Sequence, residues 1–183
     1  NLPILQHEKL KDSEFIDTLK SFNAVIFVVV AFRMLPEVVY SIPKMGTFNV
    51  HASLLPNYRG AAPIHHAVIN GEKETGVTTF FLNQEIDKGD IIRSKKVAIG
   101  DTETTGELYQ RLMIAGAELA VETLNAIEKG TAQRRKQEEI GILKPAPKIF
   151  KEDTHIFWND TAQNIFNKIR GLAPFPGSFS LIE

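Results

Sequence analysis

The stretch FNAVIFVVVAF, residues Phe22–Phe32, is continuously apolar and rich in valine. Such a run is typical of a strand that is buried on both faces of a parallel sheet. A helix is expected directly before it, because Asp12 or Ser13 can cap a segment whose apolar residues Phe15 and Leu19 lie one turn apart. A helix next to a buried strand is the repeating unit of α/β proteins.

The alternation of helix and strand continues along the chain. Helical periodicity and short apolar runs predict five more elements: strands at 47–50, 77–82 and 91–99, and helices at 63–70 and 105–129. Thr104 and Glu107 are spaced as a capping box for the last of these helices, and Gly130 ends it. The pattern therefore predicts an α/β domain with a mostly parallel sheet.

The character of the sequence changes after Gly130. Residues 131–153 are polar and basic and then contain two prolines, in KPAPKIFKED, so we expect a linker laid over the surface. A further helix is predicted from Asp160, and the ending APFPGSFSLIE begins like a strand. We therefore expect one domain at 1–130, the linker, and the start of a second domain at 154–183.

The composition is that of an ordinary globular protein. Of the 183 residues, 43% are hydrophobic and 23% are charged, and the net charge of -1 gives no global attraction to nucleic acid or acidic membranes. The absence of cysteine excludes disulfides, thiol nucleophiles and cysteine-ligated metals, and fits a cytoplasmic protein. No apolar run approaches the length of about 20 residues that spans a bilayer. We expect no membrane segment and, because the chain begins with Asn1, a fragment of a longer protein.

The segment FNVHASLLPNYRGAAP, residues 48–63, carries the first candidate site residues. A predicted strand ends at Asn49–His51, and ligands bind at the carboxyl ends of strands in open parallel sheets. Residues two apart on a strand point to the same side, so the amide of Asn49 lies beside the imidazole of His51, which titrates near neutrality. Such a pair by itself is more often structural than catalytic.

A second segment, GVTTFFLNQEIDKGDII at residues 76–92, passes from a buried strand into an acidic loop. For Glu85 and Asp90 we expect a solvated acidic turn. Asp87 alone gains a functional interpretation, because it can close on His51 from the end of the neighbouring strand. A carboxylate near an imidazole favours the protonated ring.

Together these segments resemble the folate-dependent formyltransferase family. The resemblance is carried by HASLLPNYRGAAPI and NGEKETGVTTFFLNQEIDKGDII, and it extends over nearly the whole chain through LPILQHEKLKD, VVVAFRMLP, KPAPKIFKED and IRGLAPFPGSFS. The SLLP loop followed by RGAAP, with Asn and His ahead and an acidic loop downstream, is not a generic α/β feature. The resemblance implies a Rossmann-like formyltransferase domain at 1–130 that lacks its N-terminal part. It also implies a C-terminal β-barrel, of which 154–183 is only the start.

The resemblance also implies the site residues. Asn49, His51 and Asp87 take the positions of the family's catalytic trio, and Pro56 takes that of its cis-proline. Arg59 is a candidate to meet a phosphate or carboxylate of the acceptor, with a solvated arginine as the equal alternative. The cosubstrate, 10-formyltetrahydrofolate, is expected to contact residues of the two loops and the strand exit: Phe32, Arg33, Met34, Leu35, Ser53, Leu54, Leu55, Pro56 and Asp87.

The implied reaction moves the formyl group from the folate to an amine. Protonated His51 and the Asn49 amide would stabilise the oxyanion, while Asp87 would hold the imidazolium and accept the amine's proton. KPAPKIFKED and ETGVT favour the methionyl group on initiator tRNA as acceptor, in a monomeric cytoplasmic enzyme of translation initiation. An amino sugar on a nucleotide, water in a folate hydrolase, and a non-catalytic domain of the same fold remain alternatives.

The remaining histidines do not predict a metal site. His65 and His66 are adjacent on a predicted helix and point about 100° apart, and His7 and His155 stand alone. We expect all four to be surface or satisfied core residues, and no metal. The basic run Arg134–Lys136 is compatible either with solvated charge or with contact to an RNA backbone.

Overall fold

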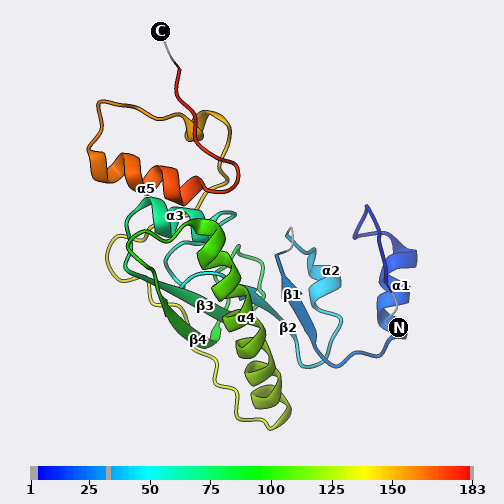
Figure 1. Cartoon of the computed structure of the whole chain (residues 1–183). Coiled ribbons are helices and arrows are strands. Elements are labelled where there is room, and N and C mark those ends of the chain that lie inside the picture. Colours follow the sequence, from blue (N-terminus) through cyan, green and yellow to red (C-terminus); the bar gives the residue numbers. More distant parts are fainter. Residues whose placement is uncertain (1–3, 32–33, 182–183) are drawn as a thin grey trace.

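The computed structural model describes residues 4–31 and 34–181, and Figure 1 shows their arrangement. These residues form a sheet whose strands lie in the order β1 (Phe27–Val30), β2 (Thr47–His51), β3 (Glu74–Phe81) and β4 (Ile91–Ala98). The helices are α1 (Ser13–Ser21), α2 (Glu37–Tyr40), α3 (Pro63–Ile69), α4 (Thr105–Glu128), the 3-10 helix η1 (Glu152–Thr154) and α5 (Ala162–Leu172). The predicted α/β class is confirmed.

The strand directions correct the prediction of a mostly parallel sheet. Among the strands of the described residues, only β1 and β2 pair in parallel, whereas β2 with β3 and β3 with β4 are antiparallel. The chain leaves the sheet at the end of β2, at His51, and enters β3 from that same side, because Thr78 of β3 is the partner of His51. The connection through α3 therefore does not return the chain to the opposite edge, as the crossover helix of a parallel pair does.

The strand predicted over residues 22–32 is shorter and more exposed than expected. β1 comprises four residues that alternate between half-buried and exposed, and Val28 and Val30 are 41% and 61% exposed. Within the described part of the chain, β1 is one of the two edge strands and pairs only with β2. It therefore lacks the neighbours that bury both faces of a central strand, and that part of the prediction was wrong.

Helix α4 supplies much of the hydrophobic core. The predicted capping box is present, with the Thr104 hydroxyl accepting from the amide of Glu107 and the Glu107 carboxylate accepting from the amide of Thr104. Leu108, Leu112 and Leu119 form a buried stripe that packs against β3 and α3. Figure 1 shows α4 lying across one face of the sheet. Burial of each leucine contributes about 1.5–3 kcal/mol.

Residues 131–153 are mostly exposed and form no helix or strand before η1. The basic run is attached to the sheet rather than free. The guanidinium of Arg134 lies 3.8 Å from the ring centroid of Phe81, and Arg135 forms a β-bridge with Ile91 at the start of β4. The linker therefore follows the edge of the sheet at its beginning.

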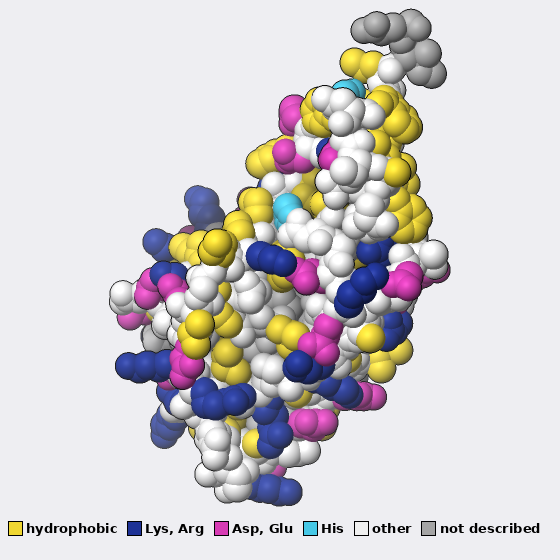
Figure 2. Space-filling view, turned by 90° about the vertical axis from the view of Figure 1, so that its left-hand side faces the viewer, with side chains coloured by type: hydrophobic (Ala, Val, Ile, Leu, Met, Phe, Trp, Pro, Cys, Tyr) yellow, Lys and Arg dark blue, Asp and Glu magenta, His cyan; other side chains and the backbone are white. Residues whose placement is uncertain are grey.

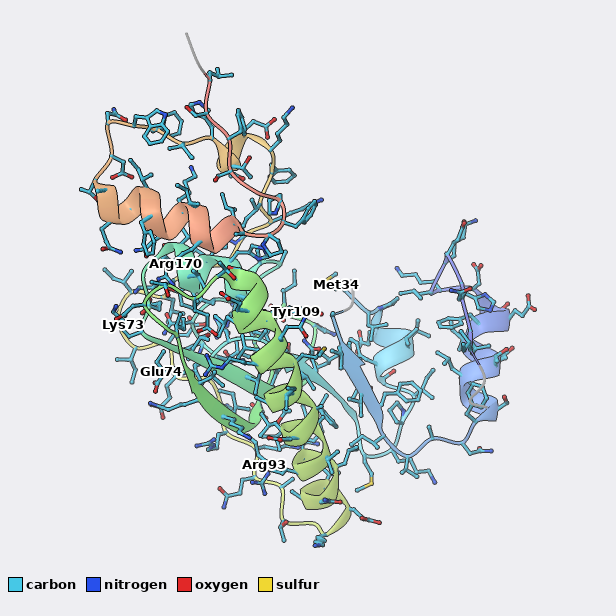
Figure 3. All side chains as sticks on the ribbon, viewed as in Figure 1. Met34, Lys73, Glu74, Arg93, Tyr109 and Arg170 are labelled. Carbon is cyan, nitrogen blue, oxygen red and sulfur yellow. The ribbon has the colours of Figure 1, made fainter. Side chains whose placement is uncertain are left out.

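The C-terminal part is anchored through α5, which packs on α3. Gly171 lies so close to Ile69 that a Cβ would meet its backbone nitrogen at 2.9 Å. Arg170, labelled in Figure 3, is buried, and its Nη1 donates to the carbonyls of Gly100 and Glu103 in the loop before α4. These contacts fix α5 to both α3 and the start of α4.

The surface carries charges of both signs. On the face shown in Figure 2, Lys and Arg side chains are interspersed with Asp and Glu, in keeping with the net charge of -1. Exposed aromatic side chains gather in the C-terminal part: Phe150, Phe157, Trp158, Phe166 and Phe175. None of the helices in the described residues is long and apolar enough to cross a bilayer.

Candidate active site

His51 ends β2, and its imidazole is fixed on two sides. Nε2 lies 2.8 Å from the main-chain carbonyl oxygen of Tyr58, and the ring of Phe80 meets the imidazole edge to face at a centroid distance of 6.4 Å. A carbonyl oxygen only accepts, so Nε2 carries a hydrogen whether the ring is neutral or protonated. Nδ1 is therefore the nitrogen that gains or loses a proton.

Asp87 lies opposite Nδ1 of His51. Nδ1 and Oδ2 are 4.0 Å apart, and the two side chains are only 8% and 15% exposed. The same Oδ2 accepts from the amide of Gly60 at 2.9 Å. At this separation the carboxylate acts on the imidazole through its charge rather than through a direct hydrogen bond. Nδ1 is thus left available to a ligand.

The predicted convergence of His51 and Asp87 is confirmed, but a shared carboxyl edge is not its cause. β3 runs antiparallel to β2 and ends beside Phe48, at the edge of the sheet opposite to His51. The loop at 82–90 therefore folds back to bring Asp87 to the imidazole. His51 and Asp87 are therefore neighbours, as predicted, but they do not come from the same end of adjacent parallel strands.

Asn49 lies two residues before His51 in β2, and both residues line the same cleft. Within residues 4–31 and 34–181, Oδ1 of Asn49 is buried without a hydrogen-bond partner. An unsatisfied buried polar atom costs about 1–3 kcal/mol. A bound group that donates to this amide, or accepts from it after the amide turns, relieves that cost. The Asn49 amide is therefore available to a substrate.

The trio of Asn49, His51 and Asp87 lines a cleft of about 1630 Å³. Its walls include Met34 from the segment after β1 and Tyr109 from α4, both labelled in Figure 3. Sites for one small molecule usually measure roughly 300–1,000 Å³. The cleft therefore has room for two substrates beside the trio.

The predicted folate-binding residues fall into separate places. Met34, Leu35 and Asp87 line the cleft. Phe32 and Arg33 lie outside the described residues. The remaining four, at 53–56, form the base of the loop and do not line the cleft. Contact of any of these residues with folate stays a prediction.

A threonine of β3, which was not predicted as a site residue, holds the loop at residues 53–57. Thr78 Oγ1 donates to the carbonyl of Ser53 and accepts from the amide of Leu55, while the Ser53 hydroxyl donates to the carbonyl of Asn57. The Leu55–Pro56 peptide bond is cis. The only sequence signal for Thr78 was a hydroxyl within an apolar strand, and such hydroxyls usually bond within their own sheet.

Arg59 does not line the cleft, and its guanidinium is already engaged. Nη1 donates to Glu139 Oε1 at 2.6 Å, and Nη2 donates to Gln137 Oε1 at 2.6 Å. The Glu139 carboxylate is half exposed, so this ion pair contributes little to stability. The role of Arg59 in binding an acceptor stays a prediction. Gln137 had no distinguishing signal in its polar surroundings.

The side chain of Tyr58 anchors the carbonyl that holds His51. Its hydroxyl donates to Glu72 Oε1 at 2.6 Å and accepts from Asn70 Nδ2 at 3.2 Å. Burial, and then the hydrogen bond to Glu72, raises the pKa of Tyr58 well above its usual value, so the hydroxyl keeps its proton. Burial alone would also raise the pKa of Glu72, but hydrogen bonds from Lys144 and Tyr58 outweigh it and lower that pKa.

Two of the other histidines bond to main-chain carbonyls. Nε2 of His65 lies 3.1 Å from the carbonyl oxygen of Phe175, and Nε2 of His66 lies 2.9 Å from that of Pro147. In the described ranges, no group of three or more His, Asp or Glu side chains is placed to hold a metal ion.

The sequence matches models of known protein families over most of its length. The sequence model described as formyl transferase matches residues 2–124, and that described as the formyl transferase C-terminal domain matches residues 148–183. The first match alone covers most of the chain. The chain belongs to the formyl transferase family.

Named formyl transferases and their structural relatives are similar to this chain. It is 52% identical over 183 residues to the methionyl-tRNA formyltransferase of Bacteroides thetaiotaomicron, covering 98% of this chain and 57% of that protein. The chain thus spans little more than half the length of this relative.

Solved structures show the same formyl transferase fold. The N-formyltransferase from Helicobacter canadensis, solved with folinic acid and dTDP-3-aminofucose, matches at 30% identity with a TM-score of 0.61, over 68% of this chain and 46% of that one. HypX from Aquifex aeolicus, solved with tetrahydrofolic acid, matches at 20% identity with a TM-score of 0.77, over 91% of this chain and 29% of that one.

Proposed function

We propose that the full-length protein transfers a formyl group from 10-formyltetrahydrofolate to the amino group of initiator methionyl-tRNA, for translation initiation in the cytoplasm. The observation that carries the proposal is the 52% identity, over 98% of the chain, to a methionyl-tRNA formyltransferase. The site supports it, because an oxyanion-stabilising pair and a carboxylate line one cleft. We also propose a catalytic domain at 1–130, a linker at 131–153 and a C-terminal domain from 154.

The first chemical step is attack of the amine nitrogen on the formyl carbon. The carbonyl oxygen becomes an oxyanion, which Nδ1–H of protonated His51 and the amide of Asn49 stabilise. Nε2 cannot serve, because its hydrogen is engaged by the Tyr58 carbonyl. Removal of one such donor in other enzymes costs about 10²–10³ in kcat.

The second requirement is a route for the proton of the attacking amine. The amine becomes positively charged as the C–N bond forms, and Asp87 accepts its proton, directly or through water. As the bond to N10 of the folate breaks, that nitrogen takes up a proton. The negative charge of Asp87 faces the imidazole of His51 across 4.0 Å during both steps. Nδ1 and Oδ2 are 4.0 Å apart and so do not hydrogen-bond to each other. This supports the proposed roles, because Nδ1–H is free to donate to the oxyanion and Oδ2 can accept the amine's proton.

Binding of two substrates is supported by the size of the cleft. We propose that the folate lies against the wall formed by the strand exit, where Met34 and Leu35 line the cleft, and reaches Asp87 with its formyl group. The amino acid at the tRNA end then enters from the side of the Gly60 loop, near Arg59. Two substrates held in one cleft gain from proximity. No metal is needed for this chemistry.

An amino sugar on a nucleotide is the second candidate acceptor. It is favoured by the solved N-formyltransferase that carries dTDP-3-aminofucose, to which this chain is 30% identical. The identity to the methionyl-tRNA formyltransferase is higher and covers more of the chain. The tRNA acceptor is therefore preferred.

A formylation assay of the full-length protein tests the proposal. The protein would be given 10-formyltetrahydrofolate with methionyl-tRNA, with a nucleotide-linked amino sugar, or with no acceptor. We expect transfer to methionyl-tRNA only. Transfer to the sugar alone, release of formate without acceptor, or no turnover would each refute the proposed acceptor.

A further inference from the structure

The side chain of Gln137, in the linker, joins the two loops of the candidate site. Its Nε2 donates to the carbonyl oxygens of Asp87 at 2.7 Å and Gly89 at 2.9 Å. Its Oε1 accepts from Nη2 of Arg59 at 2.6 Å and from Nε at 3.1 Å. A side-chain amide has two donor hydrogens and two acceptor lone pairs, and here all four are used. The amide cannot rotate without losing them.

The two loops also contact each other directly. Nε of Arg59 donates to the main-chain carbonyl of Asp87 at 3.2 Å, and a second direct bond fixes the carboxylate. The amide of Gly60, next to Arg59, donates to Oδ2 of Asp87 at 2.9 Å. Gln137 thus holds the main chain of Asp87 while Gly60 holds its carboxylate. Both contacts therefore tie Asp87 to the loop whose Tyr58 carbonyl bonds to His51.

The backbone on either side of the imidazole needs such support. Asp87 and Tyr58 both adopt left-handed conformations, with φ of 53° and 60°. A non-glycine residue in this region costs on the order of 1 kcal/mol or more and persists only where its surroundings hold it. The linker contributes at both places, because the amide of Tyr58 donates to the carbonyl of Lys144 at 2.6 Å and Gln137 binds the carbonyl of Asp87.

We propose that Gln137 is a positioning residue for the formyl transfer described above. It sets where the carboxylate of Asp87 stands relative to Nδ1 of His51, and it does so from the linker rather than from the catalytic domain. The inference rests on the proposed function, in which Asp87 faces His51 and accepts the proton of the amine. Gln137 acts through Asp87 and touches neither substrate.

Two substitutions separate the parts of this role. Gln137→Met keeps the length of the side chain but removes all four hydrogen bonds. Gln137→Glu keeps an acceptor for Arg59 but turns an acceptor toward the carbonyls of Asp87 and Gly89, so it repels the loop that it should hold. Gln133→Met is the matched control, because Gln133 is an exposed linker residue.

The kinetic test uses the full-length protein and a double-mutant cycle. Both Gln137 variants should lower kcat by up to about 10²-fold, the cost of a misplacement near 1 Å, while the KM for 10-formyltetrahydrofolate stays near wild type and the control keeps wild-type kinetics. In an Asp87→Asn background, Gln137→Met should lower kcat little further, because its target is gone. An equal factor in both backgrounds would show a general structural role and overturn the proposal.

Hydrogen–deuterium exchange tests the loops without any turnover. In Gln137→Met, peptides covering 57–62 and 83–90 should exchange faster than in wild type and in Gln133→Met, while the peptides of α4 do not. Unchanged exchange in both loops would overturn the proposal. If the wild-type protein formylates nothing, the proposed function fails, but this measurement still decides whether Gln137 holds the two loops together.

Discussion

The carbonyl oxygen of Tyr58 lies 2.8 Å from Nε2 of His51 and thereby decides which imidazole nitrogen faces Asp87. Nε2 keeps its hydrogen, so only Nδ1 exchanges a proton, and Nδ1 is the nitrogen 4.0 Å from the carboxylate. The carboxylate thus places its negative charge beside the nitrogen that faces the cleft. Protonated His51 then presents Nδ1–H at the cleft, where the proposed mechanism requires a donor to an oxyanion.

Replacement of His51 should therefore affect the reaction rather than binding. His51→Ala in the full-length protein should lower kcat by about 10²–10³-fold and leave the folate dissociation constant nearly unchanged, because the oxyanion exists only near the transition state. Steady-state formylation and a folate titration measure the two quantities. A weakened folate affinity with intact kcat would make His51 a recognition residue instead.

Replacement of the carboxylate should cost most of the activity as well. In Asp87→Asn the side-chain amide can still accept from Gly60, but it cannot take the amine's proton. If the two residues work as a unit, the double variant with His51→Ala should have nearly the kcat of the less active single variant. Multiplying losses would show that they act independently.

The parts of the fold that depend on local sequence were predictable. Helix α4 begins at the Thr104–Glu107 capping box and buries the stripe that its periodicity predicts, since both features lie within the helix itself. The direction of β3 was not predictable in this way. An apolar run has the same composition in either direction, and the pairing of Thr78 with His51 depends on the route of the chain through α3.

In the candidate site, too, some features were predictable from the sequence and others were not. The convergence of Asn49, His51 and Asp87 was predictable, because two of them share a strand face and the resemblance implies that all three belong to one site. The Tyr58 carbonyl and the Gly60 amide were not, since main-chain groups leave no trace in residue identity. Gln137 is 50 residues from Asp87 along the chain, and nothing in a polar linker distinguishes the one amide that folds back onto the site.

The ion pair behind Tyr58 should make stability depend on pH. Hydrogen bonds from Lys144 and Tyr58 outweigh the effect of burial and lower the pKa of Glu72 in the folded state. A carboxyl group with a lowered folded-state pKa stabilises the protein above its unfolded pKa, about 4.3, and loses that contribution as pH falls through the folded-state value. Glu72→Gln should thus be less stable than wild type at pH 7, by less than about 1 kcal/mol.

Denaturant unfolding at several pH values measures this difference. The gap in free energy of unfolding between wild type and Glu72→Gln should shrink as the pH is lowered below about 4.3. Glu74→Gln is the matched control, because Glu74 forms only an exposed ion pair with Lys96. A gap that stays constant with pH would show that Lys144 does not stabilise the ionised Glu72.

The linker lies so close to the loop at Gly60 that a side chain at this position would overlap with it. Gly60 has φ of 124°, and a Cβ on it would lie 2.3 Å from the carbonyl oxygen of Ala146. That carbonyl accepts from the amide of Ala62, and the amide of Ala146 donates to the carbonyl of Arg59, so the linker cannot move away without breaking both bonds. The amide of Gly60 itself holds Asp87.

Gly60→Ala should accordingly lose both stability and activity. We expect a fall of about 3 kcal/mol or more in the free energy of unfolding, from overpacking and backbone strain together, and a loss of kcat even where the variant is folded, because Asp87 loses its anchor. Gly141→Ala is the matched control: Gly141 is a linker glycine with φ of 74° and no atom within 4 Å of its Cβ position, so it reports strain alone, about 1–2 kcal/mol. Denaturant unfolding and formylation kinetics of both variants measure the difference. Equal losses of stability at the two positions would mean that contact with the linker does not constrain the loop at Gly60. The geometry of the candidate site would then be set by residues before the linker.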